Sequence, residues 1–384
     1  MFRLSNLIKS VVENKKERSL NGNIAIWNLT NRCNLLCLHC YSKASLDSKD
    51  TLTTQIIKNT IDNFEKNDIK FIIFSGGEPL VRKDIFEIAT YAKERNIITY
   101  LSTNGLYINP SNAKKIVDTF DYIGISIDGD ETTHDHFRAL KGSYQKSLKA
   151  IKLIQDSGGR VGIRFTLTKK TIHSLEHIFK LSELHDISKV YISHLVYSGR
   201  GEDNLNIDLD QTQRKKAVKF IIDKAFSYYE TNSNIEIVTG NMEQDAIVFL
   251  DIFSKKYPNL KDIMYKKLLT WGGNSAGRKL VNIDSQGFIK PDPFFPKAIG
   301  NILEDDFSKF WNSKENKLLN RLREHPRKIL GKCSQCRYIE ICNGGSRSRA
   351  YSIYHNIWAQ DPSCYLSEEE IKSDKNFAYS SNIF

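Results

Sequence analysis

The sequence predicts an α/β fold, a partial (β/α)6 TIM-like barrel followed by a smaller cysteine-rich domain. Short β-rich runs alternate with helical patterns from about residue 24 to 230, which is typical of βαβ units and a parallel sheet. Six such units are too few to close a standard eight-stranded barrel. The alternation then stops, and four of the seven cysteines follow. We expect a lead segment at residues 1–22, the barrel at 23–235 and the C-terminal domain at 236–384.

The elements follow from hydrophobic periodicity and from turn residues. The expected strands are residues 24–29, 71–74, 97–101, 122–126, 161–167 and 190–195. The expected helices are residues 53–67, 83–95, 144–156, 174–184 and 211–229. Turn-rich segments at 271–277 and 284–295 precede a short helical stretch at 307–322. Sites in such barrels lie at the C-terminal ends of the strands, so motifs at those ends are the candidates for function.

Composition places the chain among ordinary globular proteins. It has 384 residues, 40% of them hydrophobic and 26% charged. It has no apolar run long enough for a membrane helix and no secretory signal, so we expect a cytoplasmic protein without a membrane partner. The net charge of +11 is spread along helical segments and no nucleic-acid-binding motif is present, so no nucleic-acid partner is expected. A solvated lysine surface is one explanation of the charge, and an anionic substrate is the other.

Three cysteines stand directly after the first expected strand. Cys33, Cys37 and Cys40 form a C-x3-C-x2-C triplet. Three thiolates can bind three irons of a [4Fe–4S] cluster and leave the fourth iron open for chemistry. A partial zinc site is the alternative for an isolated triplet of this kind.

A second motif follows at the end of the next expected strand. Gly76 and Gly77 precede Glu78 and Pro79, and glycines allow the backbone to bend and to approach a ligand that a Cβ atom would block. Glu78 and nearby peptide groups are candidates to bind the ammonium and carboxylate of an amino acid. A plain β-to-α turn is the alternative for the glycine pair alone.

The two motifs together resemble the radical S-adenosylmethionine (SAM) superfamily. The resemblance extends to Ser102-Thr-Asn-Gly105 and to Ser126-Ile-Asp-Gly129, at the ends of the third and fourth strands. It implies that the cysteine triplet binds the cluster and that SAM is cleaved to a 5′-deoxyadenosyl radical. It also implies that Gly77 and Glu78 face the methionine moiety and that Ser126 faces the ribose. The candidate SAM-binding residues are Gly76, Gly77, Glu78, Ser102, Asn104, Ser126 and Arg138.

Two positions near this site have alternative explanations. His39 precedes Cys40, where the family usually has an aromatic residue near the adenine, and we expect it to pack or to donate a hydrogen bond rather than to bind metal. Arg138 ends a His-Asp-His-Phe-Arg stretch that also occurs in superfamily members with a C-terminal SPASM domain. A guanidinium can pair with a carboxylate of SAM or of the substrate. The alternative for this stretch is a helix approach capped by Ser143.

The C-terminal region contains the other four cysteines. Cys333, Cys336, Cys342 and Cys364 can fully bind an auxiliary [4Fe–4S] cluster, and they are the expected basis of an iron–sulfur domain of SPASM or twitch type. A structural zinc site is the alternative, because a sequence cannot identify the metal. The seven cysteines then divide into three ligands of the first cluster and four ligands of the auxiliary site.

Further stretches resemble the radical SAM enzymes of haem d1 biosynthesis and their relatives in the alternative haem pathway. This family trims side chains of sirohaem-derived tetrapyrroles, and its haem d1 members are associated with removing two propionates from 12,18-didecarboxysirohaem. The resemblance implies the same reaction here and an electron donor such as flavodoxin or ferredoxin. The chain departs from the family pattern at Lys290, where a histidine is common, at Pro293-Phe294 and at Asn343-Gly-Gly. The matching stretches begin at Met1, Ile26, Ser193, Gly273, Asn282 and Trp358.

The substrate contacts are expected after the sixth strand. His194, Tyr197 and Arg200 are the candidate catalytic or substrate-binding residues, and packing, a hydrogen bond or a tight turn are the alternatives for each. A radical SAM peptide maturase is a second hypothesis, but only about 23 residues precede the first strand, too few for the peptide-binding domain usual there. A non-enzymatic iron–sulfur carrier is a third, and it has no use for an open iron site.

Overall fold

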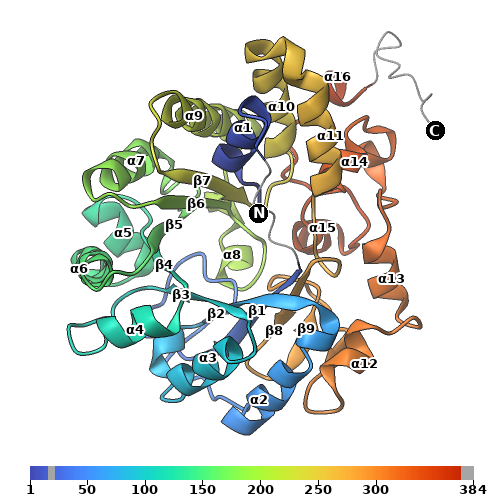
Figure 1. The fold of residues 1–384 in the computed structure, drawn as a ribbon. Coiled ribbons are helices and arrows are strands. Elements are labelled where there is room, and N and C mark those ends of the chain that lie inside the picture. The colour runs from blue at the N-terminus through green and yellow to red at the C-terminus, as the bar shows by residue number, and fades with distance from the viewer. Residues whose placement is uncertain (16–21, 373–384) are drawn as a thin grey trace.

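One mixed sheet organises the molecule, and helices cover its outer face (Figure 1). The computed structural model describes residues 1–15 and 22–372. Residues 16–21 of the expected lead segment and 373–384 of the expected C-terminal domain lie outside the described residues. The strand order in the sheet is β10-β9-β8-β1-β2-β3-β4-β5-β6-β7. The pairs from β1 to β7 are all parallel, so their carboxyl ends meet at one edge.

The six expected strands are all present. They are β1 (Asn23–Thr30), β2 (Ile69–Gly76), β3 (Ile98–Thr103), β4 (Tyr122–Ser126), β5 (Val161–Leu167) and β6 (Lys189–His194). The helices that connect or follow them are α2 (Thr54–Asp62), α3 (Ile85–Lys93), α4 (Ala113–Thr119), α5 (Glu131–Arg138), α6 (Ser143–Asp156), α7 (Leu175–Leu184), α8 (Arg200–Asp203) and α9 (Gln211–Glu230). Trp27, Phe74 and Phe120 are fully or almost fully buried in the core between strands and helices. The partial barrel that the βαβ pattern predicts is therefore confirmed.

The sheet continues beyond the six strands that the sequence predicts. β7 (Glu236–Gly240) pairs with β6, so the parallel sheet extends past residue 235. β8 (Leu280–Ile283) returns to pair in parallel with β1, and β9 (Phe288–Lys290) and β10 (Gly300–Asn301) continue antiparallel. Between β7 and β8 lie α10 (Asp245–Lys256) and α11 (Lys261–Trp271). β8, β9 and β10 have only two to four residues, which give too little alternation to be recognised in the sequence.

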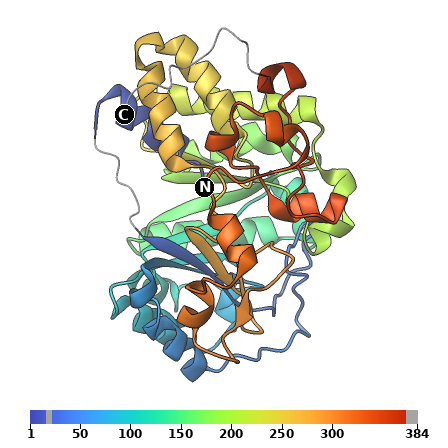
Figure 2. The ribbon, with the colours of Figure 1, turned by 90° about the vertical axis from the view of Figure 1, so that its right-hand side faces the viewer.

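The remaining chain runs along the open side of the sheet, between β7 and β9 (Figures 1 and 2). It contains α12 (Phe307–Trp311), α13 (Lys317–Arg323), α14 (Ile339–Cys342), α15 (Arg347–Tyr354) and α16 (Glu368–Ile371), and α1 (Leu4–Val12) packs near β7 and α9. The guanidinium of Arg349 ties this segment to the barrel, because it pairs with Asp361 at 2.8 Å and donates to the Leu195 carbonyl at 3.0 Å. No helix in the described part of the chain has both the length and the apolar character that a membrane span requires.

Candidate active site

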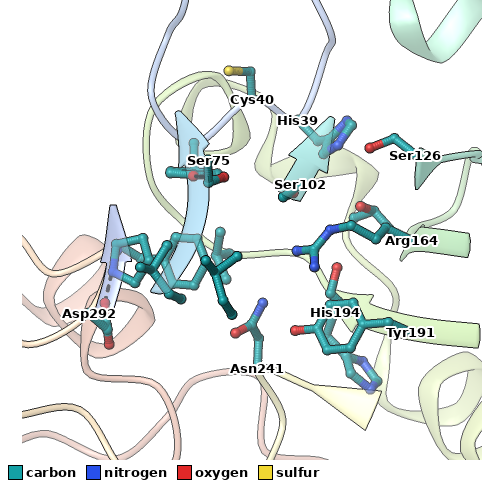
Figure 3. A pocket seen from close by; sticks show the side chains of 18 of the residues that line it. His39, Cys40, Ser75, Ser102, Ser126, Arg164, Tyr191, His194, Asn241 and Asp292 are labelled. Carbon is teal, nitrogen blue, oxygen red and sulfur yellow. Dashed lines mark hydrogen bonds between the residues drawn. The ribbon is translucent and has the colours of Figure 1, made fainter. Parts of the chain in front are cut away.

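A cavity of about 250 Å³ opens at the carboxyl ends of the strands, and we call it the barrel cavity. Its lining combines the strand ends and the loops after them with residues 274–276 and 292–294 from the C-terminal half. Figure 3 shows side chains from both parts pointing toward one space. Among the expected site residues, those that line it are Cys33, Cys37, Cys40, Gly76, Gly77, Ser102, Asn104, Ser126, Arg138 and His194. Glu78, Tyr197 and Arg200 do not line it.

The three cysteines of the triplet are free thiols on one side of this cavity. Cys33 and Cys37 are buried and Cys40 is half-buried. Burial raises the pKa of the Cys33 thiol to about 12. Three free thiols that share one cavity fit a cluster whose irons each bind one thiolate.

The loop after β6 holds the cysteine loop in place. The Arg200 guanidinium donates to the carbonyl oxygens of Cys37 at 2.7 Å and Ala44 at 3.2 Å, and its backbone N–H donates to the Cys40 carbonyl at 2.8 Å. Asn204 donates to the Leu38 carbonyl at 3.0 Å. Arg200 is thus directed at backbone carbonyls rather than into the cavity, and the structure gives no support to its place among the candidate substrate-binding residues.

The glycine pair allows two backbone segments to come together. A Cβ atom on Gly76 would lie 2.3 Å from the Thr30 carbonyl oxygen, and one on Gly77 would lie 2.2 Å from that of Arg32. The Gly77 N–H donates to the Thr30 carbonyl at 2.7 Å. The glycines therefore fit the turn after β2 against the chain that enters the cysteine loop, a close approach between backbones that the motif alone did not indicate.

Glu78 is fully buried behind this turn. Its carboxylate accepts hydrogen bonds from the Thr103 hydroxyl at 2.8 Å and from the N–H groups of Asn104 at 2.8 Å and Leu80 at 3.1 Å. Burial raises its pKa above the usual range, although these bonds oppose the shift. The Glu78 carboxylate fixes the turn after β3 and does not reach the cavity. The neighbouring residues Gly76 and Gly77 line the cavity at this point.

Arg138 has its charge satisfied within the protein. Its Nε donates to Asp128 Oδ2 at 2.6 Å, and Nη1 lies 3.7 Å from the Cys37 sulfur. Burial alone would raise the pKa of Asp128, but the adjacent Arg138 charge and other interactions bring it below its ordinary value. The pair joins the end of β4 to the cysteine loop, and Asp128 also accepts from the Thr166 N–H at 2.7 Å.

The His39 ring packs against α5, and its buried Nδ1 has no hydrogen-bond partner among the described residues. Its ring stacks on Phe137 with centroids 4.4 Å apart and planes 5° from parallel. Burial, reinforced by the Arg138 charge, lowers its pKa to about 3, so the ring is neutral. The helix approach nearby is capped differently from the expectation: Gly142 precedes α6, and the Asp135 carboxylate accepts from the Gly142 and Tyr144 N–H groups.

His194 and Tyr197 belong to a buried polar network between β6, α9, α10 and the C-terminal segment. His194 Nδ1 lies 3.1 Å from Arg214 Nη1, and because a guanidinium only donates, the ring proton is on Nε2 and points to Asp245 at 3.0 Å. The Tyr197 hydroxyl donates to Asp208 at 2.6 Å, and burial raises its pKa to about 12. The polar atoms of both side chains thus have protein partners. Both side chains point toward the contact between the barrel and the C-terminal segment rather than toward a ligand.

The four C-terminal cysteines gather beside α14 and the segment before α16. Cys333, Cys342 and Cys364 are buried, Cys336 is half-buried, and all are free thiols. Burial raises the pKa of Cys333 to about 11, and the field of the nearby Cys364 adds to the shift. Within the described ranges no three Cys, His, Asp or Glu side chains are close enough to hold one metal ion, whereas cluster thiolates each bind a different iron. Four neighbouring free thiols suit such a cluster.

Two cavity residues escaped the sequence analysis. Arg164 enters from β5, where the alternation Gly162-Ile-Arg164-Phe-Thr166 is the signal that places it on the inner face. Asp292 enters the cavity from the loop after β9, and burial raises its pKa to about 6. Lys290, which replaces the family histidine, pairs with Asp284 at 2.8 Å and lines a separate cavity of about 400 Å³.

The chain forms a partial parallel barrel, and its cavity presents a C-x3-C-x2-C triplet beside a Gly-Gly turn. This arrangement is typical of the enzymes that cleave SAM at an open iron site. Comparison with known proteins agrees. The model of the radical SAM superfamily matches residues 27–182. The chain is 36% identical over 378 residues to the pre-heme d1 synthase of Dinoroseobacter shibae, which covers 96% of this chain and 93% of that protein. It is 34% identical over 354 residues to the Fe-coproporphyrin III synthase of Methanosarcina barkeri, covering 91% and 89%.

The chain belongs to the radical SAM superfamily, and this membership implies SAM and a [4Fe–4S] cluster as its cofactors. Its fold is similar to the crystal structure of Streptococcus suis SuiB bound to S-adenosylmethionine, with a TM-score of 0.70 and 17% identity, covering 90% of this chain and 78% of that chain. At that identity the similarity concerns the fold alone. The fold class and the enzyme class predicted from the sequence are both confirmed.

Proposed function

We propose that this enzyme initiates the removal of propionate side chains from a sirohaem-derived tetrapyrrole, 12,18-didecarboxysirohaem, as in haem d1 biosynthesis. The observation that supports this most is the 36% identity to a pre-heme d1 synthase over 96% of the chain, because it extends well beyond the superfamily motifs. A second candidate is the reaction of the alternative haem pathway, since the Fe-coproporphyrin III synthase is similar over 91% of the chain.

The residues of the barrel cavity have separate tasks in this proposal. Cys33, Cys37 and Cys40 hold the first cluster, and the backbone at Gly76 and Gly77 forms the wall beside it. When bound, the cluster and SAM supply the radical that abstracts a substrate hydrogen. Ser102, Asn104 and Ser126 line the cavity at the ends of β3 and β4, where we propose that they contact SAM. Arg138, already paired with Asp128, orients the cysteine loop through Cys37 rather than binding a carboxylate of SAM or of the substrate.

We further propose that Cys333, Cys336, Cys342 and Cys364 bind an auxiliary [4Fe–4S] cluster. The support is that all four are free thiols and lie close together, since the charge of Cys364 raises the pKa of each of the other three. Anaerobic reconstitution should give about eight irons per chain, and changing Cys33, Cys37 and Cys40 to alanine should leave about four. Zinc in place of that remaining iron would contradict the second cluster. A flavodoxin or ferredoxin is the expected electron donor.

The test of the reaction is mass spectrometry of the tetrapyrrole after anaerobic incubation with SAM, a reductant and 12,18-didecarboxysirohaem. A product that has lost its propionates, formed together with 5′-deoxyadenosine, is the expected result. A product with the mass of Fe-coproporphyrin III would assign the chain to the second candidate. An unchanged tetrapyrrole with slow SAM cleavage would refute both candidate reactions and would leave the superfamily assignment in place.

A further inference from the structure

Arg164 projects from the middle of β5 into the barrel cavity (Figure 3). On the neighbouring strand β4, a Cβ atom at Gly124 would lie 2.9 Å from Arg164 Cδ, so the glycine makes room for the stem of the side chain. On the other side, the guanidinium lies 4.8 Å from the centroid of the Tyr191 ring. A glycine groove and an aromatic face together hold the cation in a defined position.

This guanidinium has no hydrogen-bond or ion-pair partner among the described residues, and the cavity carboxylates Glu243 and Asp292 do not pair with it. Arg138 pairs with Asp128. Arg200 lies outside the cavity lining and donates through Nε and Nη1 to backbone carbonyls, while its buried Nη2 has no hydrogen-bond partner among the described residues. A half-buried guanidinium that is held in position without a partner among the described residues can bind a carboxylate in bidentate fashion, donating a hydrogen bond to each oxygen.

We propose that Arg164 binds a side-chain carboxylate of the substrate, an inference that rests on the proposed tetrapyrrole reaction. Arg164 is the register partner of Ser126, the residue expected to face the ribose of SAM, so its position separates it from the methionine carboxylate rather than from SAM altogether. The cysteine loop follows β1 and the glycine turn follows β2, whereas Arg164 is on β5, three strands further around the sheet. An anion held by Arg164 therefore lies on the wall across the cavity from the turn expected to face the methionine moiety.

The experiment uses the full-length, anaerobically reconstituted enzyme and its Arg164→Gln and Arg164→Lys variants. Arg160→Gln is the matched control, because Arg160 is an exposed arginine just before the same strand. Binding of 12,18-didecarboxysirohaem and of its fully esterified form is titrated by absorbance, and SAM binding and uncoupled SAM cleavage are measured separately. Iron content and circular dichroism establish that each variant is folded.

Arg164→Gln should raise the dissociation constant of the acid form roughly 10- to 100-fold, the range for losing a charge-assisted hydrogen bond, and Arg164→Lys should raise it less. The wild type should bind the acid form more tightly than the ester, and this preference should shrink by the same factor in Arg164→Gln. The reason is that esterification of the ligand and the Arg164→Gln substitution both remove the same guanidinium–carboxylate interaction. SAM binding and uncoupled cleavage should stay within about twofold of the wild type by the same reasoning. Arg160→Gln should change none of these values.

Weaker SAM binding with unchanged substrate affinity would overturn the proposal and reassign Arg164 to the cofactor. Unchanged binding of both ligands would overturn it as well. If the wild type converts the tetrapyrrole while Arg164→Gln binds it equally well, the inference fails and the proposed function stands. If the wild type neither binds nor converts the tetrapyrrole, the proposed function itself fails.

Discussion

Replacing Gly77 with alanine should displace the chain that enters the cysteine loop. The new Cβ atom would lie 2.2 Å from the Arg32 carbonyl oxygen and 2.7 Å from its carbonyl carbon. Both are backbone atoms, so no side-chain rotation relieves the contact. Ordinary contact begins at 3.4 Å, and the oxygen must therefore move by at least 1.2 Å, the difference between these distances. Arg32 immediately precedes Cys33, so the first thiol moves with it.

The cost has two parts. Overpacking of this kind costs about 1–3 kcal/mol. Moving the Arg32 carbonyl also disturbs its hydrogen bond from the Glu78 N–H, 2.8 Å long, which adds about 0.5–1.5 kcal/mol. Together they amount to roughly 1.5–4.5 kcal/mol. With an unfolding entropy of about 0.8 kcal/mol/K for a chain of this length, the apparent Tm should fall by about 2–6 °C.

The assay combines thermal unfolding with iron analysis and electron paramagnetic resonance after reconstitution. Gly77→Ala should lose iron from the first cluster and keep the proposed auxiliary cluster. Gly158→Ala is the control, because its φ of +83° makes alanine unfavourable while no atom lies within 4 Å of the added Cβ. It should cost about 1–2 kcal/mol and retain all iron. Wild-type iron content and Tm in Gly77→Ala would refute the argument.

The structure makes three further predictions. Arg200→Lys keeps the charge but cannot reach the carbonyls of both Cys37 and Ala44, so the iron content of the first cluster should fall, and it should fall further in Arg200→Ala. Unchanged iron in both variants would show that these hydrogen bonds are dispensable. Because burial raises the pKa of Asp292 to about 6, the folded protein retains a proton that the unfolded chain releases near pH 3.9, and stability falls as the pH rises from about 4 to 6. Relative to Asp292→Asn, the wild type should lose about 1.4 kcal/mol between pH 5 and 7.5, measured as unequal Tm shifts, and parallel shifts would contradict the raised pKa. Glu78→Gln replaces one accepting oxygen with an amide donor and should cost about 1–3 kcal/mol, seen as a lower Tm, whereas an unchanged Tm would show that its buried hydrogen bonds contribute little.

Local patterns were enough to predict the long strands and the place of the cysteine triplet. Each expected strand contains several apolar residues in a row or in alternation, and the triplet follows β1 directly. The short strand β8 was missed because it pairs with β1, which lies far earlier in the sequence. Tertiary neighbours supply most of the stabilisation of such short segments.

The destinations of individual polar side chains were the hardest part to predict. Arg200 attracted attention because it stands between two glycines, yet its guanidinium meets the carbonyls of a loop 163 residues earlier in the chain. His194 and Tyr197 stand at the expected strand end, but their partners come from α9, α10 and the C-terminal segment. No spacing rule identifies partners of this kind, because they depend on how the C-terminal half closes the barrel.

That closure also changes the interpretation of the basic charge. A net charge of +11 suggested a cationic cleft for an anionic substrate, but around the barrel cavity most guanidiniums are neutralised or engaged by the protein itself. Arg138, Arg214 and Arg349 each face a buried carboxylate, and these pairs fix the cysteine loop, the β6 end and the C-terminal segment. If Arg164 binds the substrate carboxylate as proposed, affinity within the cavity depends on this guanidinium, which has no hydrogen-bond or ion-pair partner in the part of the chain that the structure describes. The overall charge then affects encounter rates, whereas one positioned side chain sets the register of the bound anion.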